Sequence, residues 1–132
     1  MKNQFLTAAL VASVTAGLAV TTVVRSAPPV FAQQPACLHG TDEAADQKAR
    51  RQGALQVARA VNTAQAAYSS RTREYGRLEN LSVTAPVPYG FTVGLSATSD
   101  SYAFSVKDAV DPCHFAYFSD QNGVIFHGEA IR

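Results

Sequence analysis

The chain has 132 residues, enough for one small domain, and its 11 Lys and Arg side chains nearly balance 10 Asp and Glu. A nucleic-acid-binding domain normally carries a basic surplus, so this balance argues against that class of partner. The basic side chains at positions 48–59 are partly offset by acidic ones at 42–46, which is typical of a solvated helix face.

The first 32 residues have the pattern of a secretory signal peptide. Lys2 provides a positive charge near the start, and Phe5–Val24 follows without a charged residue. Val30 and Ala32 are the small side chains that signal peptidase requires next to its cleavage site. We therefore expect cleavage after Ala32 and a mature protein in the periplasm or outside the cell.

The length of the apolar run leaves a second possibility open, an uncleaved membrane anchor. Phe5–Val24 has 20 residues, about what a helix needs to cross a bilayer. Its richness in Ala, Thr and Ser and the Pro28–Pro29 pair behind it favour cleavage, because prolines break a helix that leaves the membrane. We expect the protein at the inner membrane only if this run is retained.

The two cysteines of the chain are Cys37 and Cys113. In an exported protein an even count predicts a disulfide, which here would join the segment before the main helix to the C-terminal sheet. The alternative is a metal site formed by the Cys₂His₂ set Cys37, His39, Cys113 and His114. The gaps within each Cys–His pair are tighter than structural zinc sites use. We therefore expect a disulfide, no metal and no other cofactor, and little effect of replacing His39.

A lead-in segment, 33–41, precedes a single domain predicted to span 42–132. Its helix is expected from Asp42 to Tyr75, and Gly76 should stop it because glycine readily ends a helix. Apolar residues at helical spacing form the buried stripe, namely Ala54, Val57, Val61, Ala64, Tyr68 and Tyr75.

After residue 82, apolar residues alternate with polar ones, which is the period of a half-buried strand. An Asn-Gly pair at 122–123 is a strong hairpin signal. The expected strands are 91–97, 102–107, 115–118 and 124–131. The predicted fold class is α+β, with one long N-terminal helix packed on a four-stranded antiparallel meander sheet, because the apolar face of the sheet needs a cover.

The predicted helix–sheet interface follows from these two periods. On the helix it consists of Val57, Val61, Ala64 and Tyr68. On the sheet it consists of Phe91, Val93, Phe104 and Phe115. Since Ala64 is small between larger neighbours, we expect the two backbones to be closest there.

Three short motifs occur in a characteristic order. Residues 61–68 read Val-Asn-Thr-Ala-Gln-Ala-Ala-Tyr, residues 73–77 read Arg-Glu-Tyr-Gly-Arg, and residues 118–125 read Phe-Ser-Asp-Gln-Asn-Gly-Val-Ile. They resemble, in turn, the head half of the helix, the helix exit and the final hairpin of type IV pilins and type II secretion pseudopilins. The resemblance covers about Gln56 to Arg132 and implies a pilin-like globular head with a protein partner in the cell envelope.

The N-terminal region departs from the prepilin pattern. Gln4 stands before Phe5 where a prepilin has Gly, and Ala9 stands where the mature pilin has Glu. The prolines at 28–35 also interrupt any helix that would continue into the head. The element that packs a pilus filament is therefore missing or uncoupled from this head.

The predicted role is that of an exported, non-enzymatic structural or interaction domain in envelope assembly or a secretion apparatus. His39, His114 and His127 invite catalytic interpretations, but no nucleophile elbow surrounds a serine, and we expect no catalytic residues. Two alternatives remain open: a membrane-anchored minor pilin-like or pseudopilin-like subunit, and a periplasmic domain that binds a small ligand or a metal.

Overall fold

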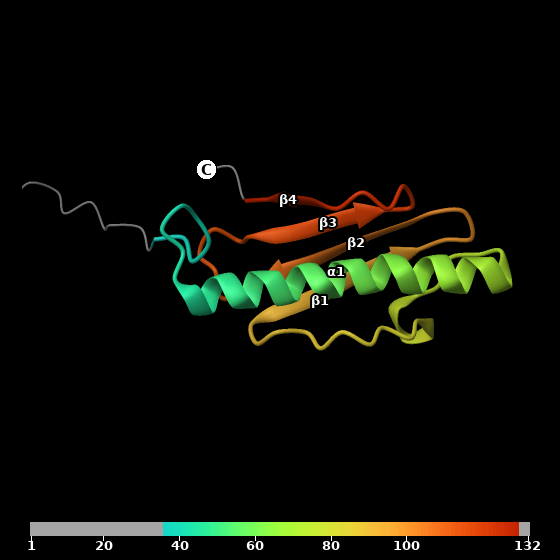
Figure 1. Cartoon of the computed structure of the whole chain (residues 1–132). Helices are drawn as coiled ribbons and strands as arrows, with labels where there is room; N and C mark the ends of the chain where they lie inside the picture. The colour runs from blue at the N-terminus through green and yellow to red at the C-terminus, as the bar shows by residue number, and fades with distance from the viewer. Residues whose placement is uncertain (1–35, 130–132) are drawn as a thin grey trace, which may run out of the picture. The chain divides into compact units, whose positions relative to one another are not determined.

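In the computed structural model, which describes residues 36–129, one helix covers one face of a four-stranded antiparallel sheet (Figure 1). The strands follow one another in the order β1-β2-β3-β4, so the chain meanders through the sheet. The α+β class with this sheet is therefore confirmed. The predictions for the first 32 residues, and for the last strand beyond residue 129, lie outside the described residues. The elements are α1 (Ala45–Thr72), η1 (Leu78–Asn80), β1 (Phe91–Ala97), β2 (Tyr102–Asp108), β3 (Ala116–Asp120) and β4 (Phe126–Gly128).

The helix is shorter at both ends than the sequence predicts. It begins at Ala45 rather than Asp42, and its N-cap residue, Ala44, makes no side-chain capping bond. It ends at Thr72 because Arg73 adopts the left-handed conformation (φ 65°) and donates its backbone N–H to the Ser69 carbonyl at 2.8 Å. The predicted stop at Gly76 is wrong, since an arginine takes the left-handed position usually given to glycine.

The core lies between α1 and the face of the sheet that packs against it. Its helix side is made of short side chains that are fully buried, namely Ala54, Val57, Ala58 and Val61. Its sheet side is made of larger ones, namely Phe91, Tyr102, Phe104, Val106, Phe115 and Tyr117. Small residues on the helix thus allow it to lie close to a sheet rich in aromatic rings. Burying each of the larger side chains contributes about 1.5–3 kcal/mol.

The strands agree with the predicted alternation. β1 has the predicted bounds, and β2 continues one residue further, to Asp108. β3 begins at Ala116 and β4 spans three residues. The predicted hairpin turn forms at Gly123, which has φ 72° and donates its N–H to the Asp120 carbonyl at 2.9 Å.

Candidate functional site

Five ionisable side chains meet where the lead-in segment reaches the start of α1 and the end of β2. We call this set, His39, Glu43, Arg50, Arg51 and Asp108, the ionic clasp. His39 is 2% exposed and lies between two carboxylates. Its Nδ1 is 2.8 Å from an oxygen of Glu43, and its Nε2 is 2.8 Å from an oxygen of Asp108.

Each carboxylate of the clasp also accepts hydrogen bonds from an arginine of α1. Arg50 donates from Nη2 to both oxygens of Asp108, at 3.2 and 3.1 Å, and its guanidinium lies 5.3 Å from the ring centre of Phe91. Arg51 donates from Nε and Nη2 to Glu43, with a shortest distance of 2.7 Å. Because the arginines are one position apart, the first turns of α1 engage both carboxylates at once.

The electrostatics of the clasp keep both carboxylates ionised. The hydrogen bond from Arg51 lowers the pKa of Glu43 to about 2, against the opposing effect of burial. Burial would raise the pKa of Asp108, but hydrogen bonds from His39 and from the backbone of Val110 outweigh it and lower that pKa. The two ring nitrogens of His39 each face one of these ionised carboxylates.

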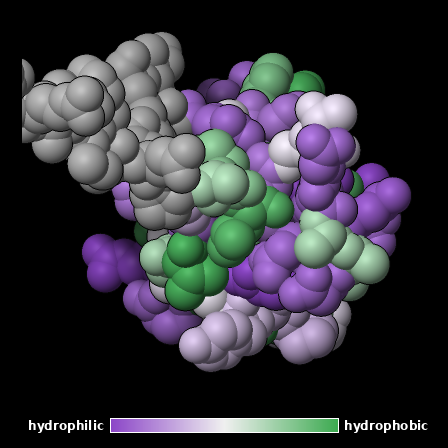
Figure 2. All heavy atoms as spheres, turned by 90° about the vertical axis from the view of Figure 1, so that its left-hand side faces the viewer, coloured by the Kyte–Doolittle hydropathy of each residue, from purple (hydrophilic) through white to green (hydrophobic). Residues whose placement is uncertain are grey.

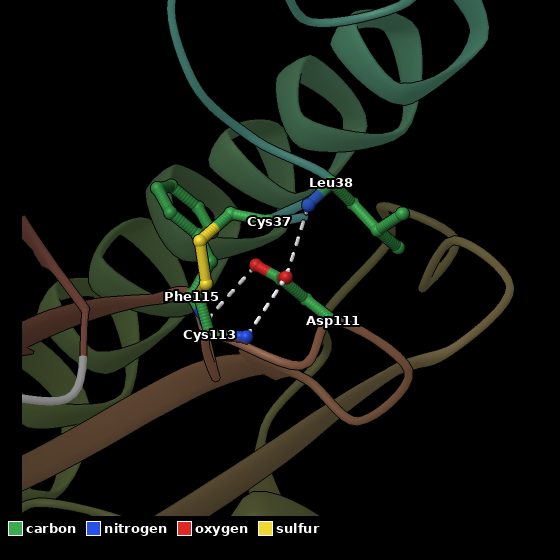
Figure 3. Close-up of a disulfide and its surroundings, with 5 residues drawn as sticks. All are labelled: Cys37, Leu38, Asp111, Cys113 and Phe115. Carbon is green, nitrogen blue, oxygen red and sulfur yellow. Dashed lines mark hydrogen bonds between the residues drawn. A yellow bond between two sulfur atoms is a disulfide. The ribbon is translucent and has the colours of Figure 1, made fainter. Parts of the chain in front are cut away.

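A disulfide and a buried aspartate fasten the lead-in segment beside the clasp. Cys37 and Cys113 are 76 positions apart and form the predicted disulfide, with Cα atoms 5.3 Å apart. Asp111 is 1% exposed and accepts hydrogen bonds from the backbone N–H groups of Leu38 at 3.1 Å and Cys113 at 3.0 Å (Figure 3). The connection between β2 and β3 is therefore joined to residue 37 covalently and to residue 38 by a hydrogen bond.

This arrangement does not match the Cys₂His₂ alternative. The sulfurs of Cys37 and Cys113 are bonded to each other, so neither is a thiolate ligand. Both nitrogens of His39 are engaged by carboxylates, and His114 is exposed with φ 54°. Within residues 36–129, no group of three or more His, Cys, Asp and Glu is placed to hold a metal ion.

The hydrogen bonds of the clasp engage both ring nitrogens of His39. His39 has no free ring nitrogen with which to accept a proton, and a general base needs one. Across the described part of the chain, every buried side-chain nitrogen and oxygen has a hydrogen-bond partner. His127, on β4, is exposed, and its ring stacks at 6.1 Å on Phe115.

The predicted helix–sheet interface divides into two groups in the structure. Val57 and Val61 lie in the core with Phe91, Phe104 and Phe115, and Val93 packs against that core. Ala64 and Tyr68 are half-buried and line a groove of about 530 Å³ between α1 and residues 80–85. Ala58 and Gln65, which the predicted interface did not include, are fully buried.

Two side-chain amides that the sequence did not predict, buried Gln65 and half-buried Asn62, connect α1 to its surroundings. Gln65 donates to the Gly76 carbonyl at 2.7 Å and accepts from the Gly76 N–H at 2.9 Å. Asn62 accepts a hydrogen bond from the Tyr102 hydroxyl at 2.8 Å and donates to Ser119 at 3.0 Å. In the sequence, each amide is a polar residue directly after a residue of the predicted apolar stripe: Asn62 follows Val61, and Gln65 follows Ala64.

The end of the domain that carries the clasp also exposes apolar surface. Val110, in the connection between β2 and β3, is 48% exposed. Figure 2 shows this end, where hydrophobic residues gather next to hydrophilic ones. Within residues 36–129, no helix combines the length and apolar character needed to cross a membrane.

Comparisons of the chain with protein-family models, with curated proteins and with solved structures found no match.

Proposed function

We propose that this chain is an exported, non-enzymatic domain of pilin-head type that acts as a structural or interaction module in the cell envelope. The observation that carries the proposal is the fastening of the lead-in segment by the Cys37–Cys113 disulfide and the ionic clasp. Disulfides form and persist in oxidising compartments, which supports export. The order of one helix followed by an antiparallel meander agrees with the motif resemblance.

The structure before the start of α1 indicates whether the proposed pilin-like head would have a continuous anchor helix. Residues 36–44 form bends and turns rather than helix, and the disulfide holds them against the β2–β3 connection. A pilin helix that continued straight from a membrane segment would need helical residues here. The proposed module is therefore a head that works without a continuous anchor helix.

The non-enzymatic part of the proposal rests on how the buried charges are used. Both carboxylates of the clasp are paired with cations, and the imidazole between them is fully engaged. Catalytic groups are expected to be accessible to substrate and to have a proton site available. These side chains instead hold the lead-in segment, α1 and β2 together.

The mature N-terminus tests this proposal. The protein is expressed in an export-competent bacterial host, fractionated and measured by intact mass, with thiol labelling to report the disulfide. We expect loss of residues 1–32 and a disulfide-bonded product outside the cytoplasm. Ala32→Leu should block cleavage because the position before the cut must be small, whereas Phe31→Leu should not.

The other outcomes are equally informative. Full-length chain in the membrane fraction, with the disulfide formed, would favour the membrane-anchored minor pilin-like subunit instead. Full-length chain in the cytoplasm with free thiols would overturn export altogether.

A further inference from the structure

The sheet face that points away from α1 has an unusual distribution of side-chain sizes. The register places Gly94 (β1), Ser105 (β2), Phe118 (β3) and Phe126 (β4) in one row across the sheet. Phe118 is 45% exposed and Phe126 is 60% exposed. We call this face the outer face. Large aromatic rings stand on its β3–β4 half, and small residues cover its β1–β2 half.

The neighbouring rows repeat the small half. Ser96 pairs with Ala103 on one side of the central row, and Thr92 pairs with Lys107 on the other. A shallow hollow of about 510 Å³ lies over Gly94, Ser96, Ala103 and Ser105, bounded by Phe118. The rings therefore stand beside a depression of a size that can receive rings of the same kind.

We propose that the outer face is a self-association surface, on which a second copy of this chain packs about a two-fold axis that runs along the strands between β2 and β3. This axis places β3 of one copy over β2 of the other. Phe118 then faces Ser105 of the second copy, and Phe126 faces Gly94 of the second copy. The same rotation brings the rings of the second copy onto the small half of the first, so the contact is isologous and closed.

The size of the face sets the strength of this contact. Four strands about 4.8 Å apart, each contributing about five residues at 3.3 Å, give a flat footprint of roughly 300 Å². The side chains make the face uneven, so its accessible surface is larger than this footprint and reaches at most about 600 Å² per copy. Specific interfaces bury about 800 Å² per partner, and the lower limit is near 600. The face is therefore at the lower limit of a specific interface, and the dimer is expected to be reversible.

Charge distinguishes this packing from the other possible two-fold arrangement. Lys107 and Asp120 lie in the rows on opposite sides of the central row. The proposed axis brings Lys107 near Lys107 of the second copy, and Asp120 near Asp120, so added salt should not weaken the dimer. An axis perpendicular to the strands would pair Lys107 with Asp120, and salt would then weaken it.

Sedimentation of the disulfide-bonded protein, over micromolar to millimolar concentrations and at low and high salt, tests the proposal. We expect a monomer–dimer equilibrium that salt does not weaken. Gly94→Phe fills the hollow and should abolish the dimer, and its fold should tolerate the change because a Cβ there meets its nearest neighbour, the Ser105 hydroxyl, at 3.6 Å. Phe126→Ala removes the ring and should weaken the dimer at least tenfold. Tyr89→Ser, at an 86% exposed position outside the sheet, is the control and should change nothing.

A size exchange gives the sharpest result. The double variant Gly94→Phe/Phe126→Ala restores a large side chain opposite a small one, so it should recover dimerisation that Gly94→Phe alone abolishes. A protein that stays monomeric at millimolar concentration would overturn the proposal. A dimer that ignores Gly94→Phe, that salt dissociates, or that the size exchange fails to restore would overturn it too. The proposal goes beyond the proposed function and does not depend on it, because these readouts are independent of the mature N-terminus.

Discussion

Replacing His39 with alanine should destabilise the domain strongly, although the sequence alone suggested little effect. The substitution removes two hydrogen bonds to carboxylates and the ring that packs at 4.8 Å on Phe115. It leaves Asp108, which is fully buried, with one hydrogen-bond partner fewer.

The magnitude follows from the partners that remain. Breaking a buried ion pair by removing one member costs about 3–5 kcal/mol when the other charge is left uncompensated. Here Asp108 keeps Arg50 and two backbone N–H donors, and Glu43 keeps Arg51. We therefore expect a loss of about 2–4 kcal/mol, which is a large part of the stability of a small domain.

Denaturant unfolding of the oxidised protein measures this loss, with His127→Ala as the matched control. His127 is an exposed histidine near the same ring, so its replacement should cost at most about 0.5 kcal/mol. Equal costs for the two variants would refute the interpretation of the clasp.

The pH dependence gives a second readout. The pKa of Glu43 is lowered from 4.5 to about 2, and that of Asp108 is lowered too, so their contribution is present above pH 4.5 and is lost as the pH falls towards 2. The wild-type and His39→Ala unfolding free energies should therefore converge in that range. A gap that is constant from neutral pH to about pH 2 would point to lost packing rather than lost ion pairing.

Three further outcomes follow from the structure. Cys113→Ser should lower the unfolding free energy by about 2–5 kcal/mol, and adding a reductant to the wild type should reproduce the loss. Gln65→Ala should cost about 1–3 kcal/mol in a thermal or denaturant melt, because it leaves the buried backbone groups of Gly76 without their partner; a neutral result would mean that water replaces the amide. Ala58→Leu should overpack the core between α1 and the sheet and lower the unfolding free energy by about 1–3 kcal/mol. Ala64→Leu places its side chain in a groove and should lower it less. The reverse order would show that α1 presents a different face to the sheet.

Sequence periodicity predicts the sheet well because the alternation of apolar and polar residues that defines each strand lies within the strand itself. The alternation in 91–97 fixes both the bounds of β1 and the side chains that face α1. The turn at Gly123 is likewise set by the two residues of its Asn-Gly pair. The disulfide needed only the count of cysteines and the expectation of export.

The hydrogen bonds of the clasp and of the Gln65 and Asn62 amides could not be predicted from sequence periodicity. His39 has one partner 4 positions away and another 69 positions away, and only the folded meander brings Asp108 to it. The ends of α1 differ from the predicted ones for two reasons. Glu43 is held by His39 and Arg51 instead of capping α1, and Arg73 adopts a left-handed conformation that an arginine in the sequence does not predict. Tertiary contacts override local preference at each of these places.

The position of the disulfide decides how the domain would respond to mechanical tension. A force applied between the chain before residue 37 and the C-terminus is transmitted from Cys37 to Cys113 through the disulfide bond. The whole stretch between the two cysteines, with α1, β1 and β2, is shielded from that tension while the bond is intact. Only β3 and β4 can extend, and they form the far edge of the sheet. Under load the protein should therefore lengthen by the span of one hairpin and then stop, whereas the reduced protein should unravel completely.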